Sequence, residues 1–292
     1  RIARNLMKSS RNVAELNKAD GQNSNGTPVL PPIATNNTAA NVLHLAELLN
    51  LAYPSFEFSA NSLVFSHQKF SPDRDYAEKQ KRYMDLINLP AGLNRIGAEA
   101  KSPIVAVIDT GGPTPGSIAD RATNFVEGGY DFVSDVDSAG DDDGFDEDPT
   151  DPNACEGPTE DCFGKYSNGS HGTHVATTIG AKNDGLDING FGVRVASLRA
   201  LGRYGWGSSS DICNAIAYAA DLENDTGTTF SEVSGGETIS VINMSLGSTG
   251  SCQCQSVIDQ AVRQGVTVVA SAGNHSSDVY GFPASCDGVI SV

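Results

Sequence analysis

Two of the chain's five histidines lie three residues apart in the stretch SHGTHVATT, residues 170–178. Histidine transfers protons near neutral pH, so His171 could act as a general base if a carboxylate held its Nδ1–H and left Nε2 accessible. The alternatives are a hydrogen-bonded core histidine, the usual role of a lone histidine, and a metal ligand paired with His174. The sequence has no HExxH motif and no third nearby ligand that would support a metal ion.

Polar groups follow three apolar runs of the chain. Asp109 follows IVAVI, Ser245 follows ISVINM, and Asn274 comes shortly after VTVVASA. The carboxyl ends of parallel strands meet at one edge of an open sheet, where such sheets bind ligands. We therefore expect an acid, a tight backbone turn and a carboxamide to converge on the crevice that holds His171.

The elements that must position these groups alternate along the chain. Short β-branched runs, apolar on both faces, are typical of buried parallel strands, and helices rich in small residues separate them. This alternation predicts an α/β fold with a doubly wound, mainly parallel sheet and helices on both faces. Strands are expected at 103–108, 195–201, 239–244, 266–272 and 288–292, and helices at 171–181, 209–222 and 254–265, the second capped by Ser209 or Ser210.

The first part of the chain has a different character. Residues 1–40 are rich in Asn and Ser and favour a loosely folded segment. A helical stripe and an extended run over residues 41–66 predict a small α+β module. We expect two units, residues 1–68 and residues 69–292.

Four sequence blocks resemble, in order, the signatures of the subtilisin-like (subtilase) serine proteases. They are VAVIDTG around Asp109, SHGTHVA around His171, NMSLG at 243–247 and VVASAGN ending at Asn274. The resemblance implies that Asp109 orients His171 as the general base and that Asn274 donates to the oxyanion. It also implies that substrate backbone pairs with two edge segments, Ser245, Leu246 and Gly247 on one side and Gly205, Trp206 and Gly207 on the other.

The resemblance also identifies what this chain lacks. No GTS motif of a nucleophilic serine occurs, so the serine is expected beyond residue 292 and the chain alone is expected to be inactive. Residues 1–68 would be the remnant of an inhibitory propeptide, and the whole a secreted serine endopeptidase made as a zymogen. The alternatives are a non-catalytic binding scaffold of the same fold and a metal-dependent hydrolase that uses His171 and His174.

A run of seven carboxylates in eleven residues, DDDGFDEDPTD at 141–151, needs an explanation because such density is self-repelling. Turn-forming Gly and Pro residues could fold it around a hard cation, and subtilases carry similar insertions, so we expect a structural Ca²⁺ site; the alternative is a solvated face. KNDGLDING at 182–190 resembles a second calcium loop more weakly. The expected ligands are Asp141, Asp143, Asp146, Asp148 and Asp151.

Composition excludes some functions and indicates a compartment. A formal net charge of −17 disfavours nucleic acid and anionic membranes as partners, and no apolar run is long enough to span a bilayer. Six cysteines without a CxxC pair favour disulfide bonds and export. Fifteen pairings are possible, and Cys213 could instead be a buried thiol.

Overall fold

A six-stranded parallel sheet is the centre of the described part of the chain. The computed structural model describes residues 86–87, 102–117, 119–120, 123–153, 170–182, 190–191, 193–274, 276 and 281–292, and the backbone of 63–66. The chain divides into two units, Arg1–Asn61 and Ser62–Val292, and all described residues belong to the second. The module expected at 41–66 lies, apart from strand 63–66, outside the described residues, as do Cys155, Cys162 and most of the loop at 182–190.

The parallel sheet has the spatial order β3-β4-β2-β6-β8-β9. Strand β2 is central, and the chain winds from it to β4 on one side and to β6 on the other, which gives the doubly wound topology expected from the sequence. All residues of β2 are buried because helices cover both faces. The strands are β2 (Ile104–Asp109), β3 (Tyr130–Asp131), β4 (Arg194–Arg199), β6 (Val241–Met244), β8 (Thr267–Ala270) and β9 (Val289–Ser291).

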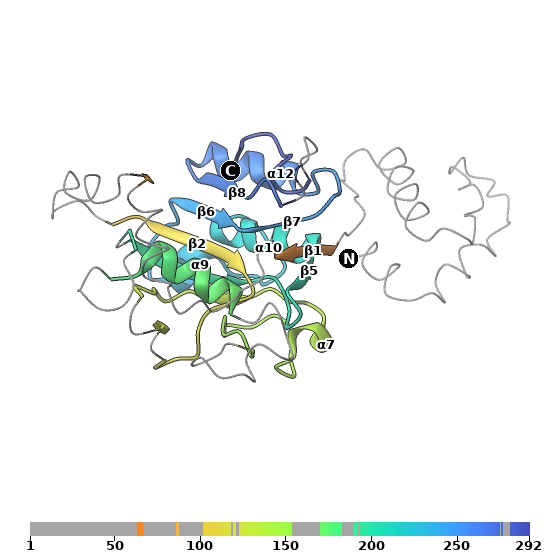
Figure 1. Ribbon diagram of the computed structural model, residues 1–292. Coiled ribbons are helices and arrows are strands. Elements are labelled where there is room, and N and C mark those ends of the chain that lie inside the picture. Colours follow the sequence, from red (N-terminus) through yellow and green to blue (C-terminus); the bar gives the residue numbers. More distant parts are fainter. Residues whose placement is uncertain are drawn as a thin grey trace, which may run out of the picture. The chain divides into compact units, whose positions relative to one another are not determined.

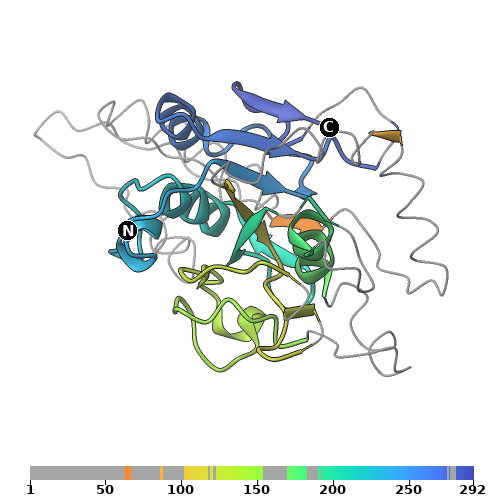
Figure 2. The ribbon, with the colours of Figure 1, turned by 90° about the vertical axis from the view of Figure 1, so that its left-hand side faces the viewer.

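Helix α9 covers one face of this sheet, whereas α10 and α12 cover the other (Figures 1 and 2). The contacts of α9 are with β2 and β4, while α10 packs on β2 and on α12, which contacts β8. The N-cap of α10 is Ser208 rather than the expected Ser209 or Ser210, because the side chain of Ser208 accepts from the Asp211 N–H. The helices are α7 (Val136–Ala139), α9 (His171–Gly180), α10 (Ser209–Ala219), α11 (Phe230–Val233) and α12 (Gln255–Arg263).

The main core lies between the sheet and the α10 side. Ala196, Leu198 and Ile108 face Ile212 and Ile216 of α10 there, and all five are fully buried. A smaller cluster on the α9 side contains Val107, Val195 and Ala176. Burial on both faces fixes the register of the central strands, because a slip of one residue would exchange the two cores.

A second, antiparallel sheet lies at one end of the parallel one (Figure 1). Its central strand β1 (Leu63–Ser66) pairs on one side with β5 (Trp206–Ser208) and on the other with β7 (Leu246–Gly247). Both outer strands belong to the edge segments that the sequence resemblance assigns to substrate binding.

Two disulfides fasten the segment after β7. Cys213 of α10 is bonded to Cys254, and Cys252 is bonded to Cys286. The alternative of a buried thiol at Cys213 is therefore wrong; the apolar face of α10 that suggested it contains a disulfide instead. Among the described residues, no helix is both long and apolar enough to cross a membrane.

Candidate active site

Asp109 and His171 form a buried hydrogen-bonded pair at the carboxyl end of the central strand. Asp109 is the last residue of β2, His171 is the first residue of α9, and each side chain is only 1% exposed. The Nδ1 of His171 lies 2.7 Å from the Oδ1 of Asp109. In the described part of the chain, the buried Nε2 of His171 has no hydrogen-bond partner. A carboxylate that binds Nδ1–H fixes the tautomer in which Nε2 can accept a proton.

Close packing between backbone segments brings the histidine to the acid. Gly172 lets the start of α9 lie against the turn after β2, since a Cβ there would lie 2.4 Å from the carbonyl oxygen of Gly111. The Gly172 N–H donates to Thr110 Oγ1 at 3.0 Å, and the Thr110 N–H donates to Asp109 Oδ1 at 2.7 Å. The helix start and the strand end are thereby held as one unit. Thr110 is absent from the sequence predictions, although its place directly after the acid in DTGG was the available signal.

Burial and charge act on His171 in opposite directions. Burial disfavours the imidazolium, but the Asp109 carboxylate, its hydrogen bond and the negative charge of Asp151 together raise the pKa of His171. His174, one turn along the helix, has its pKa lowered by burial and by the charge of His171. These environments distinguish the two histidines: the surroundings of His171 favour the imidazolium, whereas those of His174 favour the neutral ring.

The other predicted site residues follow neighbouring strands. Asn274 lies after β8 and is exposed, and Ser245 follows β6 and accepts from the Asn243 side chain at 3.1 Å. Strands β6 and β8 are adjacent on one side of β2, so their carboxyl ends lie at the edge of the sheet that carries Asp109.

The expected substrate-binding segments form the two outer strands of the small sheet. Leu246 and Gly247 constitute β7, whereas Trp206 and Gly207 open β5 after Gly205, which has a φ of +72°. A side chain at Gly207 would lie 2.1 Å from the carbonyl oxygen of Ala200. Glycine is therefore required there for the edge strand to approach the turn after β4.

The acidic loop does not gather all five expected calcium ligands. Asp141 is bonded to Arg199, and Asp151 is buried among backbone N–H groups of its own segment and of Ser170. In the described residues, no group of three or more His, Cys, Asp or Glu side chains is arranged to hold a metal ion. Burial, a hydrogen bond that protonated Asp146 donates to Asp143, and the charges of Asp143 and Asp148 do raise the pKa of Asp146. A bound cation would reduce the repulsion among these neighbouring carboxylates. Calcium binding stays a prediction.

Arg199 is a buried cation that the sequence prediction missed. It ends β4 beside Asp109 of β2, and its guanidinium donates to the carboxylates of Asp131 and Asp141 and to the carbonyl of Ala139. Burial raises the pKa of Asp131 to about 8, against the lowering effect of Arg199. The signal was present in the sequence, since one arginine stands inside the otherwise uncharged run VASLRAL.

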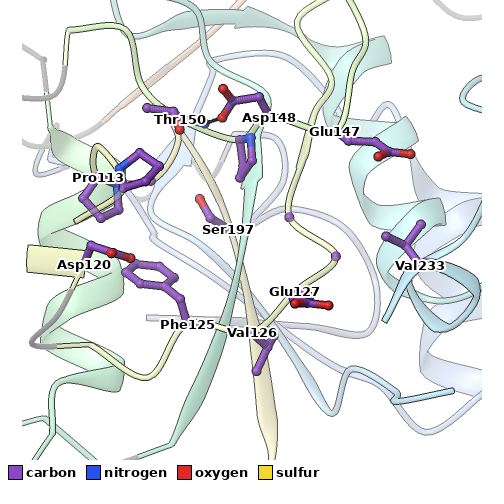
Figure 3. Close-up of a pocket in the computed structure, with 15 residues that line it drawn as sticks. Pro113, Asp120, Phe125, Val126, Glu127, Glu147, Asp148, Thr150, Ser197 and Val233 are labelled. Atoms are coloured by element: carbon purple, nitrogen blue, oxygen red, sulfur yellow. Dashed lines mark hydrogen bonds between the residues drawn. The ribbon is translucent and has the colours of Figure 1, made fainter. Parts of the chain in front are cut away.

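A pocket of about 380 Å³ lies beside β4, and its lining includes neither Asp109 nor His171. Ser197 of β4 lies near its centre, and carboxylates stand around it (Figure 3). Of the predicted site residues, only Asp148 contributes to its walls. The pocket is therefore separate from the Asp109–His171 pair. Its acidic members are Asp120, Glu127, Glu147 and Asp148.

Comparison with known proteins agrees with this geometry. The model of the subtilase family, Peptidase S8, matches residues 100–292. An extracellular protease of Xanthomonas campestris is 40% identical over 203 residues, covering 67% of this chain and 33% of its own length. A thermophilic serine proteinase of a Bacillus species is 36% identical over 261 residues, covering 84% of this chain and 49% of its own. The chain thus spans about a third to a half of these relatives.

Among solved structures, proteases from Pseudoalteromonas arctica superpose with a TM-score of 0.59 at 32% identity. The match covers 73% of this chain and 62% of that one.

Proposed function

Because the chain belongs to the subtilase family, we propose that it is part of a secreted serine endopeptidase that hydrolyses peptide bonds of proteins. The observation that carries the proposal is the buried contact of 2.7 Å between His171 Nδ1 and Asp109 Oδ1, with Nε2 of the same ring unbonded. A base held in this way needs only a hydroxyl within reach of Nε2. In this proposal, a serine beyond residue 292 of the same protein completes the triad.

In the proposed reaction, Nε2 of His171 takes the proton of the serine hydroxyl as its oxygen attacks the scissile carbonyl carbon. Asp109 stabilises the imidazolium that forms, and Asn274 donates a side-chain N–H to the carbonyl oxygen as it becomes negative. The C–N bond then breaks, and His171 returns the proton to the leaving amine. Water hydrolyses the acyl-enzyme by the same steps in reverse.

The small sheet supports proposals for the substrate and the inhibitory partner. Main-chain pairing on both sides of β1 supports the proposal that β5 and β7 hold an extended strand. A protein substrate would occupy this place in the active enzyme, and the propeptide segment that includes residues 63–66 would occupy it in the zymogen. Secretion is supported by the two disulfides and by relatives named extracellular proteases.

A fluorophosphonate serine probe tests the proposed function. The full-length protein should be labelled and should cleave casein, and His171→Ala should abolish both. Asp137→Asn, an exposed change on α7, is the matched control and should leave both unchanged. A folded full-length protein without labelling or cleavage would favour the non-catalytic scaffold. Cleavage that a chelator stops at once, without labelling, would favour the metal-dependent hydrolase.

A further inference from the structure

Asp151 is a buried carboxylate that none of the proposed catalytic steps uses. Only 2% of the surface of Asp151 is exposed to solvent. Oδ1 accepts from the Asn153 N–H at 2.8 Å, and Oδ2 accepts from the Ser170 N–H at 3.1 Å. A buried carboxylate is unfavourable unless such bonds satisfy it, and here each of its oxygens accepts one.

Thr110 connects Asp151 to both members of the catalytic pair. Burial raises the pKa of Asp151, and a hydrogen bond from the Thr110 side chain is among the interactions that oppose this rise. Because a carboxylate can only accept, the hydroxyl is the donor, and its oxygen remains able to accept from the Gly172 N–H at 3.0 Å. The Thr110 N–H meanwhile donates to Asp109 at 2.7 Å. One side chain thus links the carboxylate of Asp151 to the first turn of α9 and to the proposed catalytic acid.

Backbone pairing fastens the same segments together. The Asp151 N–H donates to the Gly112 carbonyl at 2.9 Å, and the Gly112 N–H donates to the Pro149 carbonyl at 2.8 Å. Gly111 has no room for a side chain, since a Cβ would lie 2.6 Å from the Pro149 oxygen. The end of the acidic loop therefore packs directly on the turn that follows Asp109.

The start of α9 depends on this arrangement. Its N-cap, Ser170, has a left-handed φ of 67° and makes no side-chain cap bond to the helix. Asp151 instead brings a carboxylate to the Ser170 N–H from a distant segment. Negative charge is favourable at a helix N-terminus, where the first N–H groups lack partners within the helix.

We propose that Asp151 is a positioning residue for His171. It holds the first turn of α9 against the turn after Asp109, and its negative charge favours the imidazolium formed in each catalytic cycle. The titratable groups that act on the ring are Asp109, Asp151 and His174, and Arg199 acts on Asp151. The effect on catalysis rests on the proposed function; the effect on the state of His171 does not.

The test compares Asp151→Asn, Asp151→Ala and the control Asp137→Asn in the full-length protein labelled with ¹³C-histidine. Removing the negative charge should lower the His171 pKa measured by NMR, by at least about 0.5 in Asp151→Asn. The acid limb of kcat/KM should move to lower pH by the same amount, and kcat should fall about tenfold while KM changes little. Asp137→Asn should change none of these.

A second pair of variants keeps the test decisive if Asp151→Ala fails to fold. Thr110→Val removes the hydroxyl link and should lower kcat as Asp151→Asn does, whereas Thr110→Ser restores the link and should recover most of it. An unchanged His171 pKa and kcat in folded Asp151→Asn would overturn the inference. If the wild-type protein is neither labelled nor active, the proposed function fails, and the NMR measurement alone still decides the role of Asp151.

Discussion

The carboxylate of Asp109 and the ring of His171 meet at 2.7 Å although they come from different elements and are both 1% exposed. Burial removes competing water, so the contact fixes both the ring orientation and the tautomer. The two residues are 62 positions apart in the chain, and only the pairing of helix start and strand end brings them together.

Asp109→Asn should therefore reduce kcat by about 10⁴. An amide cannot hold the Nδ1–H tautomer as the carboxylate does, so the lone pair would no longer face the nucleophile. The measurement is kcat on a peptide anilide with the full-length protein. A melting temperature equal to that of the wild type would show that the fold is kept. A loss smaller than tenfold would mean that Asp109 is not the orienting acid.

Asn274→Ala should lower kcat by about 10²–10³ and leave KM nearly unchanged. The reason is that the carboxamide is proposed to donate to the oxyanion, which exists only in the transition state and the tetrahedral intermediate. Gln264→Ala, an exposed amide at the end of α12, is the control. A rise in KM with kcat unchanged would reassign Asn274 to substrate binding.

The fold was predictable because buried strands appear in the sequence as runs of consecutive apolar residues. Most strands of the parallel sheet read as apolar runs: β6, β8 and β9 fall within the expected runs, and β2 and β4 each extend one residue beyond theirs, at Asp109 and Arg194. The short strand β3 was not predicted, since two residues carry no periodicity. The cap of α10 was misplaced by one or two residues because Ser208, Ser209 and Ser210 are chemically equivalent in sequence.

The pairing of Asp109 with His171 was predictable, because the first residue ends a strand and the second begins a helix. Pairings were not predictable where a side chain acts across the fold. In the sequence, Asp141 and Asp151 belong to one acidic run. In the folded chain, Asp141 accepts a hydrogen bond from Arg199 and Asp151 accepts one from the Ser170 N–H. Charge density along a chain does not reveal which carboxylates a distant cation or helix start will bind.

Calcium binding by the acidic loop predicts that a chelator lowers the melting temperature. Asp143→Asn or Asp148→Asn should remove most of that difference, because each takes a negative charge from the group that raises the pKa of Asp146. Differential scanning calorimetry with and without excess EDTA measures it, with Asp137→Asn as the control. Identical melting temperatures in both conditions would favour the alternative that the acidic loop is a solvated face.

Loss of the bond between Cys213 and Cys254 should lower the free energy of unfolding by about 4 kcal/mol. The sulfurs close a loop with a sequence separation of 41, and restricting a loop of that length in the unfolded chain accounts for the magnitude. Cys213→Ser with Cys254→Ser avoids an unpaired thiol, and urea unfolding measures the change. A decrease below about 1 kcal/mol would show that packing between α10 and α12 suffices without the bond.

Arg199→Met should destabilise the protein by about 3–5 kcal/mol at pH 8 and by less at pH 5. The change removes the cation that pairs with the buried carboxylate of Asp131. Removing one partner of a buried ion pair is strongly destabilising because it leaves an unpaired buried charge. Burial already raises the pKa of Asp131 to about 8 from its ordinary 3.8, and losing Arg199 removes an effect that lowers it. The folded variant therefore binds a proton that the unfolded chain releases above pH 3.8, so its stability must fall as the pH rises from there through the folded-state pKa.

Urea unfolding of Arg199→Met at pH 5 and pH 8 measures this difference through the transition midpoints. The double variant Arg199→Met with Asp131→Leu removes both charges and should recover much of the loss at pH 8, because apolar residues can replace a buried ion pair. If Arg199→Met alone loses equal stability at both pH values, and the double variant recovers none of it, Arg199 stabilises the fold through packing around Gly111 rather than through its charge.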